Sequence, residues 1–204
     1  MKFFFASVLI ALSVTFTFGQ NESAPLVEKE IAYKDWTYKN VQTGEDANLR
    51  KFTGGKKLVM VVYYAPWCPN WRHDAPFVQK MYDKYKAEGF DVIAVGEYDT
   101  VDAMKKSLAN FKITFPSVFE SEQRTDRLKT THNEYRKAVG DTRGWGSPWY
   151  IFLEPAKMEK TGDVLVKKAS VVNGELIESE IEQFIRTKLG FPAATVKTTA
   201  LAVP

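Results

Sequence analysis

The sequence predicts one α/β domain built on a central mixed β-sheet that is flanked by helices. Three observations lead to this prediction. Two apolar runs, within 56–65 and 90–98, are typical of strands buried on both faces of a sheet. A stretch of helical periodicity follows each run. Two further apolar stretches near the C-terminus are close enough in sequence to form an antiparallel hairpin, which would make the sheet mixed.

The N-terminal half of the domain is expected to begin with a strand and a turn within 35–49. The first buried strand follows. Apolar residues then recur at every fourth position over 70–89, which predicts an amphipathic helix. The second buried strand leads into another helix within 99–113, and Asp99 or Thr100 can serve as its N-cap.

The C-terminal half is expected to start with a short strand in 115–121. A polar insertion around 121–146 follows and should contain one short helix. Strands are then predicted in 147–154 and 163–172, joined as the antiparallel hairpin. An amphipathic helix over 178–190 completes the domain, because its apolar residues fall on one face.

The N-terminal 19 residues are expected to be a secretory signal peptide. Lys2 precedes an apolar run from Phe3 to Phe18, which is shorter than the ~20 residues of a membrane-spanning helix. Thr17 and Gly19 are small residues at the positions expected before a cleavage point ahead of Gln20. We therefore expect an exported protein, periplasmic or extracellular, with no stable membrane insertion after signal cleavage.

The rest of the chain is divided into three parts by composition. Residues 20–34 are polar and lack periodicity, and they are expected to be a linker. Residues 35–190 would form the domain, and 191–204 a flexible tail. The chain is 45% hydrophobic and 26% charged with a net charge of +3, a globular balance. No basic stripe with interleaved aromatic residues is present, which argues against a nucleic-acid partner.

The chain contains one cysteine, Cys68. Exported proteins usually pair their cysteines, but Cys68 cannot crosslink its own chain. It is therefore a buried apolar residue, a partner in an intermolecular disulfide, or a reactive thiol. Its expected place is between the first buried strand and the following helix, with Pro69 in the first helical turn. Unpaired N–H groups and the helix dipole favour a thiolate there.

The segment "YYAPWCPNWRHDAP" resembles the active-site segment of thioredoxin-like proteins, most closely the exported TlpA/ResA-type thiol–disulfide oxidoreductases. Their pattern is aromatic-aromatic-Ala-x-Trp-Cys-x-x-Cys-Arg-x-acid-x-Pro. The matching positions are Tyr63, Tyr64, Ala65, Trp67, Cys68, Arg72, Asp74 and Pro76. The resemblance covers 36–189 and implies a thioredoxin-like fold. It also identifies Pro148, which starts the strand in 147–154, as the cis-proline of that fold.

Trp71 departs from the pattern, because it stands where the resolving cysteine belongs. In a dithiol enzyme the first thiolate attacks a disulfide and the second thiol then releases the product. Cys68 alone can attack but cannot resolve. The sequence therefore excludes ordinary dithiol turnover, and an external thiol would be needed as reductant.

The resemblance implies roles for the residues around Cys68. Asp74 matches a carboxylate that assists proton transfer near the sulfur, although an exposed helix acid is the alternative. Arg72 would stabilise the thiolate if its side chain points back. Four residues are expected to contact substrate: Trp67, Trp71, Ser147 and Pro148. No cofactor is expected, and His73 and His132 with one cysteine give no metal-ligand spacing.

Three functions remain open at this point. The first is a single-cysteine redox protein that forms mixed disulfides with extracytoplasmic proteins or small thiols. The second is a one-cysteine peroxiredoxin-like peroxidase, but the residue three positions before Cys68 is Ala65, where a peroxidatic site needs a hydroxyl. The third is a non-enzymatic binding module, which Trp71 and the insertion at 121–146 favour, since the insertion is expected to face a partner or substrate.

The exported protein should begin near Gln20, because the apolar run before it is too short to span a bilayer and ends in small residues. N-terminal sequencing of the secreted or periplasmic fraction measures this. A mature chain that keeps Phe3 to Phe18 would show that the segment is an anchor.

Overall fold

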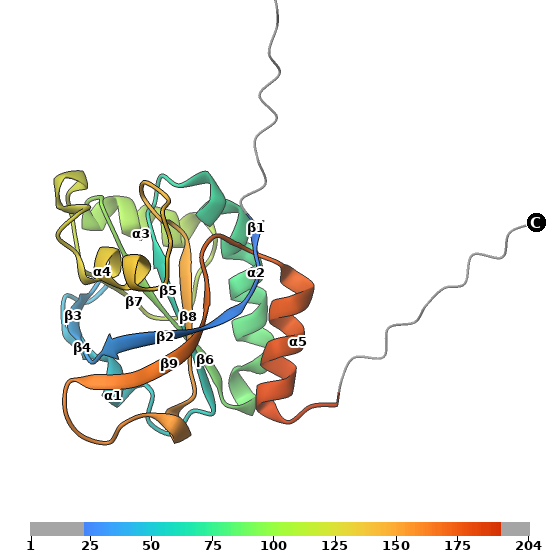
Figure 1. Ribbon diagram of the computed structural model, residues 1–204. Coiled ribbons are helices and arrows are strands. Elements are labelled where there is room, and N and C mark those ends of the chain that lie inside the picture. The colour runs from blue at the N-terminus through green and yellow to red at the C-terminus, as the bar shows by residue number, and fades with distance from the viewer. Residues whose placement is uncertain (1–22, 193–204) are drawn as a thin grey trace, which may run out of the picture.

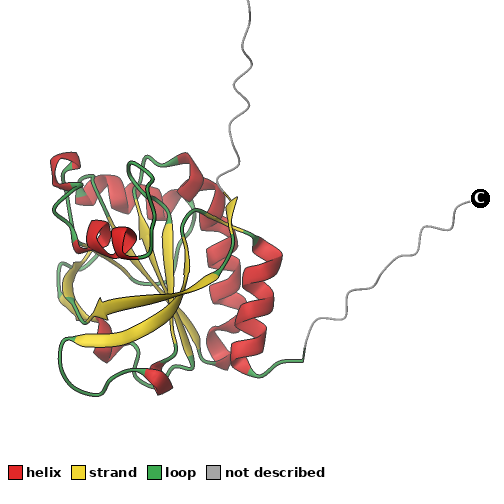
Figure 2. Cartoon of the chain, in the orientation of Figure 1, coloured by secondary structure: helices red, strands yellow, loops and turns green. Residues whose placement is uncertain are grey.

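The structure is a computed structural model that describes residues 23–192 (Figures 1 and 2). Eight strands form one mixed sheet in the order β2-β9-β8-β5-β6-β7-β3-β4. They are β2 (Val27–Lys34), β3 (Thr37–Asn40), β4 (Asp46–Asn48), β5 (Leu58–Tyr64), β6 (Phe90–Gly96), β7 (Ser117–Phe119), β8 (Trp149–Leu153) and β9 (Val164–Val172). A separate parallel pair joins β1 (Ser23–Ala24) to β10 (Glu175–Leu176).

Helices lie against the sheet, which confirms the predicted α/β class (Figure 2). The α-helices are α1 (Leu49–Phe52), α2 (Pro69–Tyr85), α3 (Val101–Asn110), α4 (Thr131–Ala138) and α5 (Glu178–Leu189). Short 3₁₀ turns occur at η1 (Lys86–Glu88), η2 (Arg124–Asp126) and η3 (Pro155–Lys157). Of the two N-caps predicted for α3, Asp99 and Thr100, the structure has Thr100. Its hydroxyl accepts a hydrogen bond from the Ala103 N–H at 3.2 Å.

β5 is the central strand. It pairs parallel with β6 and antiparallel with β8, and β8 pairs antiparallel with β9, so the predicted C-terminal hairpin is confirmed. All seven residues of β5 are buried. The parallel pairing of β5 and β6 requires a crossover, and α2 provides it.

The side chains of β5 alternate between two hydrophobic cores. Even-numbered residues from Leu58 to Tyr64 contribute to the core shared with α2, α3 and α5, and α2 and α5 lie side by side in Figure 1. Odd-numbered residues from Val59 to Tyr63 contribute to a second core on the opposite face, shared with α1, α4 and β2. The continuous apolar run thus reflects burial on both faces of the sheet.

The prediction that 20–34 is a linker is wrong for the described part, 23–34, which forms β1 and β2. β2 is an edge strand whose charged residues face outward, and these hide the strand signal. Ile31 and Tyr33 point inward, and the Tyr33 hydroxyl lies 2.8 Å from that of Tyr63.

The predicted signal peptide, 1–19, lies outside the described residues, as does 193–204 of the predicted tail. Phe191, within that tail, packs with its ring centroid 6.0 Å from that of Tyr85. In the stretch from 23 to 192, none of the helices has both the length and the apolar composition that crossing a bilayer requires.

Candidate functional site

Cys68 lies at the junction of β5 and α2, where it is the N-cap residue and Pro69 is the first residue of the helix. Its side chain is 6% exposed. The Cys68 thiol donates a hydrogen bond to the Ser147 carbonyl oxygen, with Sγ at 3.1 Å from the oxygen. The Ser147–Pro148 peptide bond is cis, so Pro148 is the cis-proline that the resemblance implied.

A cleft of about 220 Å³ opens beside the sulfur. We call it the Cys68 cleft, and it is lined by Trp67, Cys68, Pro69, Asn70 and residues 143–147. The cysteine is therefore largely buried yet lies on the wall of an open cleft. A partner sulfur that enters the cleft would meet Cys68 and the backbone before Pro148.

Asp74 lies in α2 and is 1% exposed, so the alternative of an exposed helix acid is wrong. Its Oδ2 accepts hydrogen bonds from the Tyr150 hydroxyl at 2.6 Å and the Leu176 N–H at 3.0 Å, and Oδ1 lies 3.1 Å from His73 Nδ1. Burial raises the pKa of Asp74 to about 6, although these hydrogen bonds oppose the rise. The carboxyl therefore exchanges its proton near neutral pH.

Tyr150 is the hydroxyl donor to Asp74. Burial, followed by the charges of Asp74 and Cys68, raises the pKa of Tyr150 well above its ordinary value, so the phenol stays protonated and donates to Asp74. Tyr150 contributes to the same hydrophobic core as Cys68, and its hydroxyl is bonded to Asp74.

Trp71 is fully buried, which corrects the expectation that it contacts substrate. Its ring packs against Tyr64 with centroids 4.8 Å apart, inside the core that α2 shares with the sheet. Its indole N–H has no hydrogen-bond partner among residues 23–192. The place of the resolving cysteine is therefore occupied by a core side chain.

Arg72 is exposed, and its Nε donates to the Pro66 carbonyl at 3.5 Å. It lines a second cleft of about 360 Å³, which we call the Trp67 cleft and which also contains Trp67, Asp99 and Lys106. Stabilisation of the Cys68 thiolate by Arg72 stays a prediction.

The insertion folds against Trp67. Trp145 meets the Trp67 ring edge-on, with centroids 5.0 Å apart. Arg124 lies over the Trp67 ring at 4.7 Å, and Arg127 lies over the Trp145 ring at 4.8 Å. Such contacts hold a guanidinium through the electrons of the ring face. The insertion therefore forms one side of the site, and that it faces a partner or substrate stays a prediction.

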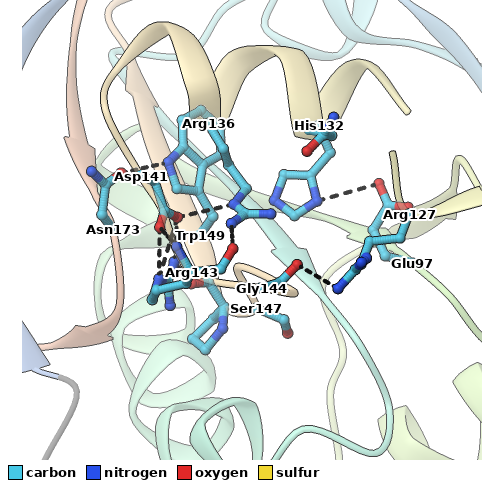
Figure 3. Close-up of polar contacts among 12 residues, drawn as sticks. Glu97, Arg127, His132, Arg136, Asp141, Arg143, Gly144, Ser147, Trp149 and Asn173 are labelled. Carbon is cyan, nitrogen blue, oxygen red and sulfur yellow. Dashed lines mark hydrogen bonds and ion pairs between the residues drawn. The ribbon is translucent and has the colours of Figure 1, made fainter. Parts of the chain in front are cut away.

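A buried ionic network fixes the segment before Pro148 (Figure 3). Arg136 Nε donates to Asp141 at 3.0 Å, and Arg143 donates both to Asp141 at 2.8 Å and to the Pro148 carbonyl at 3.0 Å. Burial alone would raise the pKa of Asp141, but hydrogen bonds from the two arginines outweigh it and the pKa is lowered. Gly146 has φ +60°, and a Cβ there would lie 1.7 Å from Arg136 Nε, so only glycine fits.

Glu97 and His132 form a buried pair that the sequence analysis left without a role (Figure 3). Both are fully buried, and Glu97 Oε1 lies 3.8 Å from His132 Nδ1. Burial raises the pKa of Glu97 well above its ordinary value and lowers that of His132 well below it, so the site disfavours the charged form of both side chains. His132 also stacks on Tyr63 with centroids 4.6 Å apart. The sequence held one signal for this pair: Glu97 directly follows the buried strand β6, where an acidic side chain is unusual.

Comparison with known proteins identifies the family of this chain. The family model described as AhpC/TSA matches residues 30–141, more than half of the chain. The chain belongs to the AhpC/TSA family. The thioredoxin-like character and the resemblance to ResA-type proteins, both expected from the active-site segment, are confirmed.

Several known proteins are similar to this AhpC/TSA protein. Thiol-disulfide oxidoreductase ResA of Bacillus thuringiensis is 29% identical over 73 residues, which are 36% of this chain and 41% of ResA. The match thus spans about two fifths of that relative. A protein of Citrus sinensis named "Probable phospholipid hydroperoxide glutathione peroxidase" is 22% identical over 170 residues, 78% of this chain and 98% of that protein.

Among solved structures, a thiol:disulfide interchange protein of the thioredoxin family from Chlorobium tepidum superposes with a TM-score of 0.57. The two chains are 16% identical, and the match covers 79% of this chain and 98% of the other. This similarity establishes the fold.

Asp74 should make the protein less stable as the pH rises from about 4 to 6. The unfolded carboxyl loses its proton near 3.8 while the folded one keeps it to about 6. Stability is therefore lost with rising pH across that window, by on the order of 3 kcal/mol. The free energy of unfolding, measured by urea at pH 4 and pH 7.5, should show this loss in the His73→Gln variant. The His73→Gln/Asp74→Asn variant should lack it. The His73→Gln background removes the neighbouring imidazole from the titration, and equal pH dependence in both variants would contradict the assignment.

Proposed function

We propose that this chain is an exported thioredoxin-like protein with a single-cysteine redox site. Cys68 would form mixed disulfides with extracytoplasmic proteins or with small thiols and disulfides, and an external thiol would resolve them. One observation carries the proposal: the Cys68 sulfur lies at the N-terminus of α2, on the wall of an open cleft and 3.1 Å from the Ser147 carbonyl.

The reaction begins when the Cys68 thiol loses its proton. Asp74, with a pKa of about 6, is ionised at neutral pH and can take up a proton; its partner Tyr150 contributes to the same hydrophobic core as Cys68. The thiolate attacks one sulfur of a partner disulfide. A new disulfide forms on Cys68, the partner's disulfide breaks, and the other partner sulfur leaves as a thiolate that takes up a proton.

The second half of the reaction needs another molecule. Cys68 is the one cysteine of the sequence, and Trp71 fills the position from which a second thiol would attack. An external thiol must therefore attack the mixed disulfide. Attack on the partner sulfur releases Cys68 as a thiolate, which takes up a proton, and leaves the partner disulfide-bonded to the external thiol. Attack on the Cys68 sulfur releases the partner as a thiol and leaves the external thiol on Cys68, so a second thiol must then restore Cys68 and leave as a disulfide. Without that thiol the captured state persists.

Peroxidase activity is the second candidate function, favoured by the AhpC/TSA family match and by the similarity to the Citrus sinensis protein. Ala65 weighs against it, since its methyl group cannot hold a peroxide. Consumption of hydrogen peroxide by the protein, with dithiothreitol as reductant, separates the two. Turnover that disappears in Cys68→Ser would establish the peroxidase.

Cys68 should form adducts that persist until a thiol is added. We expect incubation with a small disulfide to add one half-molecule per chain in the wild type and none in Cys68→Ser, because Cys68 is the sole thiol. Mass spectrometry before and after dithiothreitol, with iodoacetamide alkylation rates against pH, measures this. A thiol that neither alkylates nor forms adducts in the folded protein would leave the binding module as the function.

Trp71→Cys should create a dithiol site. The variant places two thiols at the start of α2 in the spacing of a dithiol enzyme, so reduction of insulin by dithiothreitol should accelerate well above the wild-type rate. Loss of the buried indole should lower the free energy of unfolding by about 3 to 5 kcal/mol. Trp71→Phe is the control, since it shrinks the side chain without adding a thiol. A folded Trp71→Cys protein that performs no better than Trp71→Phe would contradict the prediction.

A further inference from the structure

We propose that the surface around Cys68 binds acidic peptide segments, so that the partners it captures carry aspartate or glutamate beside the reacting sulfur. This inference rests on the proposed function and names the class of partner. Three observations support it: the clefts around Cys68 adjoin one another, most of their basic side chains lack a carboxylate partner, and two arginines are positioned by aromatic rings.

Three clefts lie next to one another around the Trp67–Trp145 pair. The Trp67 cleft and the Cys68 cleft share Trp67 as a wall. A third cleft of about 410 Å³, which we call the α4 cleft, shares Arg143 and Gly144 with the Cys68 cleft. Together they form a track with the sulfur on its middle cleft, so it has a neighbouring cleft on either side of the reacting cysteine.

Basic side chains dominate this track. Its basic residues are Arg72, Lys106, Arg127, Arg136, Lys137 and Arg143, and its acidic residues are Asp99 and Asp141. Arg136 and Arg143 are bound to Asp141, so the Asp141 charge is already balanced. The other four basic residues have no carboxylate within 4 Å anywhere in 23–192, and Asp99 is the one remaining acid of the track.

Another cleft on the same protein provides an internal comparison. It has a volume of about 340 Å³ and contains three lysines and three glutamates. Every one of these charges is paired, as Glu28 with Lys168, Glu154 with Lys157 and Glu159 with Lys167. The excess of unpaired positive charge is thus a property of the track around Cys68, and the small net charge of the chain does not account for it.

The arginines of the insertion are held in place to receive a carboxylate. Arg127 lies over the Trp145 ring, and its Nη1 donates to the Gly144 carbonyl at 3.3 Å (Figure 3). Arg124 lies over the Trp67 ring, beside the Cys68 cleft. A guanidinium fixed on a ring loses little conformational freedom when it binds a carboxylate through its remaining N–H groups.

The test uses two peptides that differ in charge. Each carries one central cysteine as a mixed disulfide with thionitrobenzoate, flanked either by aspartates or by lysines. Attack by Cys68 forms the protein–peptide disulfide and releases coloured thionitrobenzoate, and the same peptides reacting with 2-mercaptoethanol give the intrinsic ratio of rates. We expect the acidic peptide to react about ten times faster than the basic one relative to that ratio, and the preference to shrink in 0.5 M salt.

Charge reversal identifies the surface. Lys106→Glu/Lys137→Glu changes the track, and we expect it to lose most of the preference. Lys51→Glu/Lys160→Glu is the matched control, because both lysines are exposed and unpaired among the described residues. Lys160 lines a cleft at the opposite end of β5, and Lys51 follows Arg50 of that cleft in sequence. The control should keep the preference. Equal loss in both variants, or wild-type rates that follow the mercaptoethanol ratio, would overturn the inference and leave the proposed function standing.

A non-covalent binding measurement distinguishes failure of the acidic-peptide inference from failure of the proposed thiol chemistry. Cys68→Ser protein is titrated into fluorescein-labelled peptides in which serine replaces the cysteine, and anisotropy is followed. Tighter binding of the acidic peptide, weakened by Lys106→Glu/Lys137→Glu, supports the inference even if Cys68 proves unreactive. Equal binding of acidic and basic peptides overturns it, whatever the thiol chemistry shows.

Discussion

The hydrogen bond from the Cys68 thiol to the Ser147 carbonyl joins two parts of the chain that are far apart in sequence, and the site depends on it. Antiparallel pairing of β5 with β8 sets Tyr63 opposite Trp149. The residues just after β5 therefore lie beside those just before β8. A second bond, from the Ala65 N–H to the Ser147 hydroxyl at 2.8 Å, fixes the same junction. The sheet register thus places the sulfur against the backbone before Pro148.

Trp71 changes both the chemistry and the packing of this junction. A cysteine at that position would supply the second thiol of a redox pair, whereas the indole fills the core against Tyr64. The same residue that removes the resolving step of the reaction therefore adds buried apolar area, and this burial stabilises the fold. The buried carboxyl of Asp74 remains in the helix that Cys68 caps. The site thus keeps groups for forming a disulfide but not for resolving one.

The insertion at 121–146 contributes to the site through two sets of side chains, one buried and one at the surface. Its inner side chains, Arg136 and Asp141 among them, hold the segment before Pro148 through buried hydrogen bonds. Its outer arginines lie on Trp67 and Trp145 and carry positive charge to the cleft. Removing partners from the inner network would leave buried charges unpaired, which is destabilising. One segment of the chain thus carries both the arginines of the outer surface and the contacts that hold the backbone before Pro148.

The sequence by itself determined the order of the longer strands and helices after residue 56, the place of Cys68 before a helix and the absence of a resolving thiol, and the resemblance to a family identified Pro148. These features are local: periodicity, short motifs and residue counts define them within a few positions. Only the tertiary structure decided that Trp71 is buried, that 23–34 adds strands to the sheets, that Asp74 is enclosed, and that Glu97 meets His132. Each of these results depends on contacts between residues distant in sequence, such as Asp74 with Leu176 and Tyr33 with Tyr63, and no local pattern encodes which distant surface a side chain will face.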